Sequence, residues 1–366
     1  MKFELPEYNA PDFNEKRFKA APDVMIASCD MDGVAPGNYH STSIYPEYFK
    51  IGGEWKLAEE SRMDCAVVLR DNGWLDVVEG RNIRKGDRVI LGRSENCEEG
   101  IYLHAGGFMG KEDQNKDQFV FRQGRSRETS YSRDYDNLYS LLSHEREHGN
   151  IVWVMGPAFA FDHDSRSAMQ NIIEGGFAHG LLAGNALATH DLEGSFLRTA
   201  LGQDIYTQKS QPNGHYNHLD TINEVRRSGS IPQFIKDHKI ADGIIYALVK
   251  CNVPYVLTSS IRDDGPLPEV IHSAYEGQTA MRSIIRKATT IICLATQLHS
   301  IAAGNIAPSF RVVNGKVRPL FIYSIDISEF ATNKLSDRGS LTAIGIVTNV
   351  QDFIVNIAKG LGVLRN

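Results

Sequence analysis

Arg262, Asp263 and Asp264 place a guanidinium beside two consecutive carboxylates, in the string SSIRDDGPLPE that begins at Ser259. A guanidinium pairs with a carboxylate and a carboxylate pairs with an ammonium group, so this run is suited to binding an amino acid. The pKa values of two neighbouring carboxyl groups also move apart, which leaves one of the two better suited to proton transfer. The structural alternative is an Asx-turn that caps a helix beginning near Pro268. For the whole run we favour the catalytic interpretation.

His190, Asp191 and Glu193 form a second group of titratable residues, in the string GNALATHDLE. We name His190 and Asp191 as further catalytic candidates. Acidic side chains near a helix start also interact favourably with the helix dipole. At least one of Asp191 and Glu193 is therefore expected to be structural.

Polar loops follow the apolar runs of the second half of the chain. Each loop combines small residues, which let a ligand approach the backbone, with Asn, Asp, His, Ser or Thr side chains that satisfy its hydrogen bonds. In a parallel sheet, ligands collect beyond the carboxyl ends of the strands. We therefore expect one shared crevice, formed by residues 184–193, 259–269, 295–305, 326–328 and 348–350.

The elements that position these loops alternate between strands and helices. Continuous apolar runs without strict alternation are typical of strands buried on both faces. They predict strands at residues 151–155, 253–257, 290–294, 320–325 and 344–347, with a weaker candidate at 177–182. Helical patterns intervene, for example at residues 165–174, 269–287 and 351–361. This order predicts an α/β fold with a parallel sheet.

The first part of the chain has a different sequence pattern. Short β-like runs at residues 63–69, 87–92 and 100–104 are separated by glycine turns, which predicts a small and mostly antiparallel domain. We divide the chain into a β-rich domain (1–109), a charged loop or linker (110–135) and a Rossmann-like domain (136–366).

The usual dinucleotide fingerprint GxGxxG is missing after the first strand of the second part, where the chain reads GPAFAFDHD. A bound dinucleotide must then be held by another loop arrangement. Asp326 ends a predicted strand, where a carboxylate can bind both ribose hydroxyls of NAD. A helix N-cap is an equally good interpretation of Asp326, with Ser328 as a competing cap.

Composition excludes several function classes. The chain of 366 residues has a net charge of −6, which disfavours nucleic-acid and anionic-membrane binding. The five scattered cysteines and the spacing of HYNH at residues 215–218 fit neither a disulfide scaffold nor a zinc site, so no metal is predicted. Without an apolar leader or a membrane-length apolar run, we expect a cytoplasmic enzyme and a homo-oligomer.

Taken together, several strings resemble one family. GNALATHDLE, GHYNHLDTIN, VPYVLTSSIRDDGPLPEV, LATQLHSIAAGN, SIDISEFATNKLSDRGS and GIVTNV are similar to successive motifs of the lysine-oxoglutarate reductase/saccharopine dehydrogenase conserved-region family. That family includes archaeal-type ornithine cyclodeaminases and the C-terminal half of cyanobacterial arginine dihydrolase/ornithine cyclodeaminase. The resemblance also covers NYHSTSIYPEYF, MDCAVVL and IRKGDRVILG, and so nearly the whole chain.

The resemblance implies a Rossmann-like NAD-binding domain related to deoxyhypusine synthase, with a β-rich N-terminal domain. It also implies conversion of L-ornithine to L-proline and ammonia by internal hydride transfer with tightly held NAD. The small-molecule partner would be an amino acid. The implied cofactor contacts are Asn185, Ala186, Ser259, Ser260, Thr296, His299, Ser300, Asp326 and Asn349.

Three strings depart from the family pattern near the expected pocket: GPAFAFDHD at Gly156, TSS at Thr258 and RTALG at Arg198. They leave two alternatives open beside ornithine cyclodeamination. One is an NAD-dependent enzyme that acts on a different amino acid or amine. The other is a non-catalytic NAD-binding module, which the retained IRDDG cluster disfavours.

Overall fold

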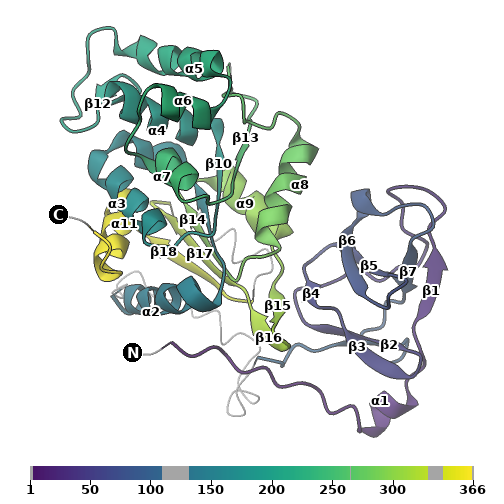
Figure 1. Ribbon diagram of the computed structural model, residues 1–366. Coiled ribbons are helices and arrows are strands. Elements are labelled where there is room, and N and C mark those ends of the chain that lie inside the picture. The colour runs from purple at the N-terminus through teal and green to yellow at the C-terminus, as the bar shows by residue number, and fades with distance from the viewer. Residues whose placement is uncertain (1–2, 109–131, 264, 329–340, 365–366) are drawn as a thin grey trace.

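Six parallel strands form the centre of the C-terminal part of the chain (Figure 1). The computed structural model describes residues 3–108, 132–263, 265–328 and 341–364. The sheet has the order β13-β10-β9-β14-β17-β18. Its strands are β9 (Ile151–Met155), β10 (Gly180–Gly184), β13 (Tyr255–Thr258), β14 (Thr290–Leu294), β17 (Phe321–Asp326) and β18 (Ala343–Val347).

The strand order identifies where a ligand should bind. Counted along the chain from β9, the order across the sheet is 3-2-1-4-5-6, which is that of the Rossmann fold. The direction of winding reverses between β9 and β14. In such sheets the crevice at the reversal point, beyond the carboxyl ends of the strands, is the usual ligand site.

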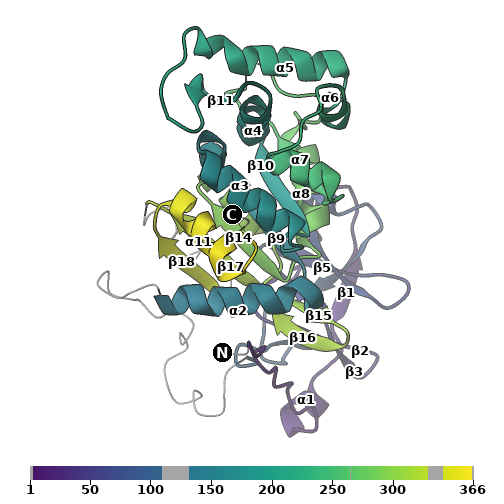
Figure 2. The ribbon, with the colours of Figure 1, turned by 60° about the vertical axis from the view of Figure 1, so that its left-hand side comes forward.

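Helices cover both faces of this sheet (Figure 2). Alternate side chains of β9 show why: Trp153 packs into a core shared with α2, α3 and α11, whereas Val152 and Val154 pack against α8 and α9. The helices that contribute side chains to the first core are α2 (Ser132–His148), α3 (His163–Glu174), α4 (Asn185–Leu197), α5 (Asn217–Ser228), α6 (Ile231–Asp237), α7 (Ile244–Lys250) and α11 (Val350–Gly360), with α5 packed on α4 and α6. Those that contribute to the second core are α8 (Ala274–Ile285) and α9 (Gln297–Ile306).

The N-terminal part is built from short antiparallel strands and one short helix, α1 (Lys16–Ala20). One sheet has the order β1-β7-β5-β6 and another β3-β2-β8. The strands are β1 (Met25–Ser28), β2 (Glu47–Ile51), β3 (Glu54–Leu57), β4 (Glu60–Ser61), β5 (Cys65–Leu69), β6 (Leu75–Glu79), β7 (Arg88–Leu91) and β8 (Ile101–Leu103).

A hairpin from the C-terminal part completes a sheet of the N-terminal part. Strands β15 (Phe310–Val313) and β16 (Lys316–Pro319) pair with each other, and β15 also pairs antiparallel with β4 through Phe310 and Ser61. The helix α2 begins within the segment 110–135 that we predict to be a linker. The three-part division of the chain remains a prediction.

The sequence pattern predicted the parallel α/β sheet and the β-rich N-terminal part, and both are confirmed. The helix predicted at 269–287 is shorter than expected, because α8 starts only at Ala274 with Ser273 as its cap. The alternative interpretation of the Arg262 run, in which it caps a helix near Pro268, is therefore wrong. Of the free cysteines, Cys251 is exposed, whereas Cys293 is buried.

Candidate functional site

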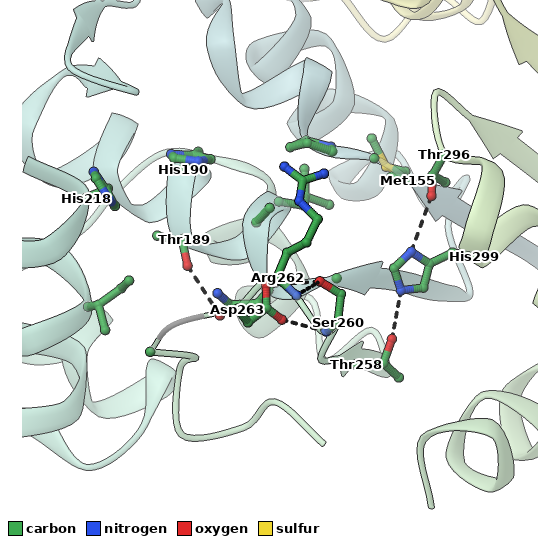
Figure 3. Close-up of a pocket in the computed structure, with 18 of the residues that line it drawn as sticks. Met155, Thr189, His190, His218, Thr258, Ser260, Arg262, Asp263, Thr296 and His299 are labelled. Carbon is green, nitrogen blue, oxygen red and sulfur yellow. Dashed lines mark hydrogen bonds between the residues drawn. The ribbon is translucent and has the colours of Figure 1, made fainter. Parts of the chain in front are cut away.

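A cavity of about 850 Å³ lies at the reversal point of the sheet (Figure 3). Its walls come from the segments that follow β9, β10, β13 and β14, and from α4, α5 and α9. Eight of the predicted site residues line it: Asn185, Ala186, His190, Ser260, Arg262, Asp263, Thr296 and His299. The cavity thus lies where parallel strands place their carboxyl ends, and three of the five predicted loops, 184–193, 259–269 and 295–305, line it, whereas 326–328 and 348–350 do not.

Two glycines let the strand ends approach closely. A Cβ atom on Gly156, which follows β9, would clash with the carbonyl oxygen of Ala295, which follows β14. A Cβ atom on Gly184, at the end of β10, would lie 3.1 Å from Cε1 of His299. Side chains at these positions would fill the floor of the cavity, so the glycines hold it open.

Two helices begin at the cavity without a side-chain cap from the described residues. Gly184 precedes α4 and Thr296 precedes α9, and neither supplies a capping hydrogen bond. By contrast, α3, α6, α8 and α11 are capped by Asp162, Ser230, Ser273 and Asn349. The N–H groups at an uncapped helix start are suited to an anionic or carbonyl oxygen of a ligand.

His299 connects the ends of two strands across the cavity floor. Its Nε2 lies 2.8 Å from the hydroxyl of Thr258, the last residue of β13, and its Nδ1 lies 3.3 Å from the Thr296 hydroxyl. Burial lowers the pKa of His299, and the negative charge of Asp263 partly opposes this shift. The imidazole is therefore held neutral near neutral pH.

The loop after β13 carries the charged groups. Asp263 closes a turn on Ser260, whose backbone N–H donates to its carboxylate at 2.7 Å. In Figure 3 the exposed Arg262 side chain extends between His190 and His299. The Ser259 hydroxyl donates instead to the carbonyl of His272 at 3.2 Å, outside the set of lining residues. Asp264 lies outside the described residues.

Asn185 ties this loop to the start of α4. Its side-chain oxygen accepts hydrogen bonds from the Leu267 N–H at 3.0 Å and from the Thr189 hydroxyl at 3.4 Å. Asn185 is 8% exposed, so its amide is committed largely to holding the loop in place. Ala186, in the first turn of α4, lines the cavity next to it.

Neighbouring residues of α4 have opposite surroundings. His190 lines the cavity, and its Nδ1 lies 2.9 Å from the carboxylate of Glu193. Asp191 is fully buried away from the cavity, paired with Arg166 at 2.9 Å. Asp191 and Glu193 lie in the middle of α4 rather than at its start, so the dipole role expected for these acidic residues does not apply. Asp191 instead caps α7, through the N–H groups of Ile244 and Ile245.

Besides Ser259, three further predicted cofactor contacts lie outside the set of lining residues. Asp326 ends β17 and accepts a hydrogen bond from the Ser328 N–H at 2.9 Å, while the helix that it was expected to cap falls outside the described residues. Asn349 caps α11 through the N–H groups of Gln351 and Asp352. Ser300 is buried beside Cys293. Their contacts with a cofactor remain predictions.

Helix α5 contributes two residues that the sequence analysis did not assign to the site. Arg226 lines the cavity and donates to the carbonyl of Pro266 at 3.0 Å. His218 lines it with its ring centroid 6.0 Å from that of His190. The HYNH string had singled out His218, but only as a candidate metal ligand. Within the described residues, no group of three or more His, Cys, Asp or Glu side chains is arranged to hold a metal ion.

In the described part of the chain, no helix combines the length and the apolar character needed to cross a lipid bilayer.

Comparison with known proteins identifies the relatives of this chain. Residues 138–357 match the family of the C-terminal Rossmann-fold domain of arginine dihydrolase ArgZ-like proteins. An ornithine cyclodeaminase of Methanocaldococcus jannaschii is 36% identical over 350 residues, which cover 93% of this chain and 78% of that protein.

Solved structures agree with this assignment. A conserved LOR/SDH protein of Methanococcus maripaludis S2 superposes with a TM-score of 0.82 and 31% identity, covering 93% of this chain and 98% of that one. The ternary complex of AgrE with ornithine and NAD+ gives a TM-score of 0.57 and 28% identity, over 94% of this chain and 46% of AgrE. The chain therefore belongs to the family that contains the archaeal ornithine cyclodeaminases and the C-terminal Rossmann-fold domain of ArgZ-like arginine dihydrolases.

Proposed function

We propose that the protein is an NAD-dependent ornithine cyclodeaminase, which converts L-ornithine to L-proline and ammonia. The observation that carries the proposal is the cavity at the reversal point of the sheet, where uncapped helix starts lie beside Arg262, Asp263 and His190. Relatives about one-third identical to this chain are named ornithine cyclodeaminases, and AgrE has been crystallised with ornithine and NAD+.

The residues around the crevice fit a dinucleotide. The N–H groups at the starts of α4 and α9 are suited to the oxygens of its phosphates or carboxamide, and Gly156 and Gly184 leave room for it against the backbone. We assign Ser260, Thr296 and His299, polar side chains that line the same cavity, to cofactor binding. When bound, NAD supplies reversible hydride acceptance and donation at the substrate's α-carbon.

The charged residues of the cavity fit an amino acid with two amines. We assign Arg262 to the substrate carboxylate, which a guanidinium binds through paired hydrogen bonds, with Arg226 on the neighbouring wall as a second positive charge. Asp263 is our candidate for binding one substrate ammonium group. Its turn with Ser260 fixes the carboxylate before substrate arrives, which lowers the ordering cost of binding.

The loop after β13 also has to keep water from the reactive carbon, because an imine formed there hydrolyses readily. The hydrogen bond from the Leu267 N–H to Asn185 holds the loop against α4, and the Arg226 bond to Pro266 holds it against α5. These contacts position the loop as a wall of the cavity. Asp263 and Arg262 are thereby presented to substrate from one side.

The proposed function is tested by incubating the purified protein with ornithine and NAD. We expect ammonia and proline in equal amounts and no net accumulation of NADH, because the hydride returns to the substrate. Replacement Asp263→Asn should lower the turnover by about 10²-fold or more, the range that charged catalytic contacts contribute, while NAD still binds. The exposed Lys250, which pairs with Glu174 on a distant face, provides a matched control as Lys250→Met.

Other outcomes assign the site differently. NADH accumulation with another amino acid, and none of these products from ornithine, would support a different substrate for the same cofactor site. NAD binding without turnover of any diamino acid, and with no effect of Asp263→Asn, would support a non-catalytic module. Either result would contradict ornithine cyclodeamination.

A further inference from the structure

A buried carboxylate stands directly behind His190. Glu193 has no exposed surface, and its Oε2 lies 2.9 Å from Nδ1 of His190. Its two oxygens also accept hydrogen bonds from the Thr199 hydroxyl at 2.8 Å and from the N–H groups of Leu201 and Gly202 at 3.2 Å. Four donors thus converge on this carboxylate. Three of them come from the string RTALG, which departs from the family pattern.

These contacts determine which nitrogen of His190 is free. An ionised carboxylate only accepts hydrogen bonds, so Nδ1 of His190 must be the protonated nitrogen. In the neutral imidazole, Nε2 then carries an unshared electron pair. Because the His190 ring lines the cavity and its side chain is only 10% exposed, this nitrogen is available to a ligand more than to bulk water.

The surroundings of His190 contain a second imidazole. The ring of His218 lies 6.0 Å away, and its Nδ1 is buried without a hydrogen-bond partner in the described part of the chain. The ring of Phe161 lies 5.4 Å from His190 on another side. Because Nε2 of the neutral His190 ring is a hydrogen-bond acceptor, a ligand group with N–H donors suits this wall of the cavity.

We infer that His190 accepts a proton from the terminal ammonium group of the substrate, and that Glu193 is the residue that positions it. The inference rests on the proposed function. One N–H bond of the ammonium breaks and a bond forms between that proton and Nε2. The freed amine adds to the imine that hydride removal leaves at the α-carbon: the new C–N bond forms as the C=N π bond breaks, and the attacking nitrogen passes one proton to the former imine nitrogen. The proton held on Nε2 then moves to that amino group, whose C–N bond breaks as ammonia departs, and the ring imine that remains takes the hydride back, so the transfer is balanced. The carboxylate of Glu193 stabilises the imidazolium between the two transfers.

The test combines a spectroscopic and a kinetic measurement on full-length protein. A two-bond ¹H–¹⁵N spectrum of histidine-labelled protein, assigned with His190→Gln, should show Nε2 of His190 unprotonated. Replacement Glu193→Gln puts an NH₂ group where a carboxylate oxygen accepted, so the tautomer should change or become mixed. With ornithine, we expect the kcat of this variant to fall about 10²-fold or more, with little change in KM.

A matched control uses a buried carboxylate outside the proposed site. Glu145 of α2 is equally buried and pairs with Arg318 at 2.8 Å, so Glu145→Gln should lower stability while the folded protein keeps the His190 tautomer and its kcat. If Glu193→Gln does not fold, His190→Gln provides the kinetic test, because its amide can still donate to Glu193. We expect it to fold, to bind NAD and to lose about 10²-fold in kcat.

The outcomes separate the two proposals. If the wild-type protein is inactive on ornithine, the proposed function fails and the proton transfer fails with it. If the wild type is active and Glu193→Gln, or His190→Gln where that variant is used, is equally active, only the role of this pair is overturned. An unprotonated Nδ1 in the wild-type spectrum also overturns it.

Discussion

At the scale of single residues, the buried His299 on the cavity floor makes the stability of the folded protein depend on pH. Because burial lowers its pKa in the folded state, the unfolded chain binds a proton more readily than the folded one. Stability is then fully present above the ordinary histidine pKa of about 6.5 and is lost as the pH falls below it toward the folded pKa.

We therefore predict that His299→Gln reduces the loss of stability at low pH. Urea denaturation of the wild type and the variant at several pH values between neutral and mildly acidic gives the free energy of unfolding of each. The difference between them should shift in favour of the variant as the pH falls. The other histidines are common to both proteins, so a difference that stays constant with pH would contradict the assignment.

Residues at the ends of parallel strands were the most predictable part of the site. Asn185, Ser260 and Thr296 meet at one cavity because the carboxyl ends of parallel strands share one edge, a relation that the apolar runs already imply. Arg226 and His218 were not predictable in the same way. Arg226 and His218 reach the cavity only because α5 packs against α4, and no periodic pattern in the sequence predicts that contact.

At the scale of elements, the clearest outcome concerns the strands. β9 and β14 are buried along their whole length, so their sequences read as continuous apolar runs and predict strands directly. The start of α8 was harder to place. Proline is common as the first residue of a helix, so Pro268 suggested a start there. The chain instead continues as a loop to Ser273, which supplies the cap of α8.

Asp191 joins three helices, since it lies on α4, pairs with Arg166 of α3 and caps α7. We predict that Asp191→Ala lowers the free energy of unfolding by about 3–5 kcal/mol, because it leaves the buried guanidinium unpaired. Denaturant titration measures this loss.

Lys250→Ala is the comparison for Asp191→Ala. It breaks the Lys250–Glu174 pair, whose lysine side chain is 50% exposed, and should cost less than about 1 kcal/mol. Equal losses in the two variants would contradict the structural role of Asp191.

At the scale of the whole molecule, arginines join the N-terminal β-rich part to the Rossmann sheet. Arg282 of α8 donates to the Val77 carbonyl at 3.0 Å and pairs with Glu79. Arg286 pairs with Glu60 at 2.7 Å, which opposes the rise that burial causes in the pKa of that carboxyl group. The strand pairing of β4 with β15 adds to these contacts.

We predict that the wild type unfolds in a single transition and that Arg282→Ala separates the two parts. The variant loses one partner of a buried ion pair, at a cost of about 3–5 kcal/mol concentrated at this junction. Trp55 and Trp74 lie in the N-terminal part and Trp153 in the sheet, so tryptophan fluorescence follows mainly the unfolding of the N-terminal part. Far-UV circular dichroism follows the loss of helices and strands in both parts.

The two probes should coincide for the wild type and diverge for Arg282→Ala. Arg84→Ala removes an exposed pair with Asp32 and should leave them coincident. Coincident curves for Arg282→Ala would indicate that strand pairing alone couples the parts.

The joining of β15 to β4 has a consequence for the order of events during synthesis. Ser61 leaves the ribosome long before Phe310, so the small sheet that contains them cannot close until most of the chain has been made. Arg62 likewise waits for the carbonyl of Ile306. Strand β4 therefore completes its pairing only after β15 has been made, although the neighbouring β-rich sheets pair within their own segment.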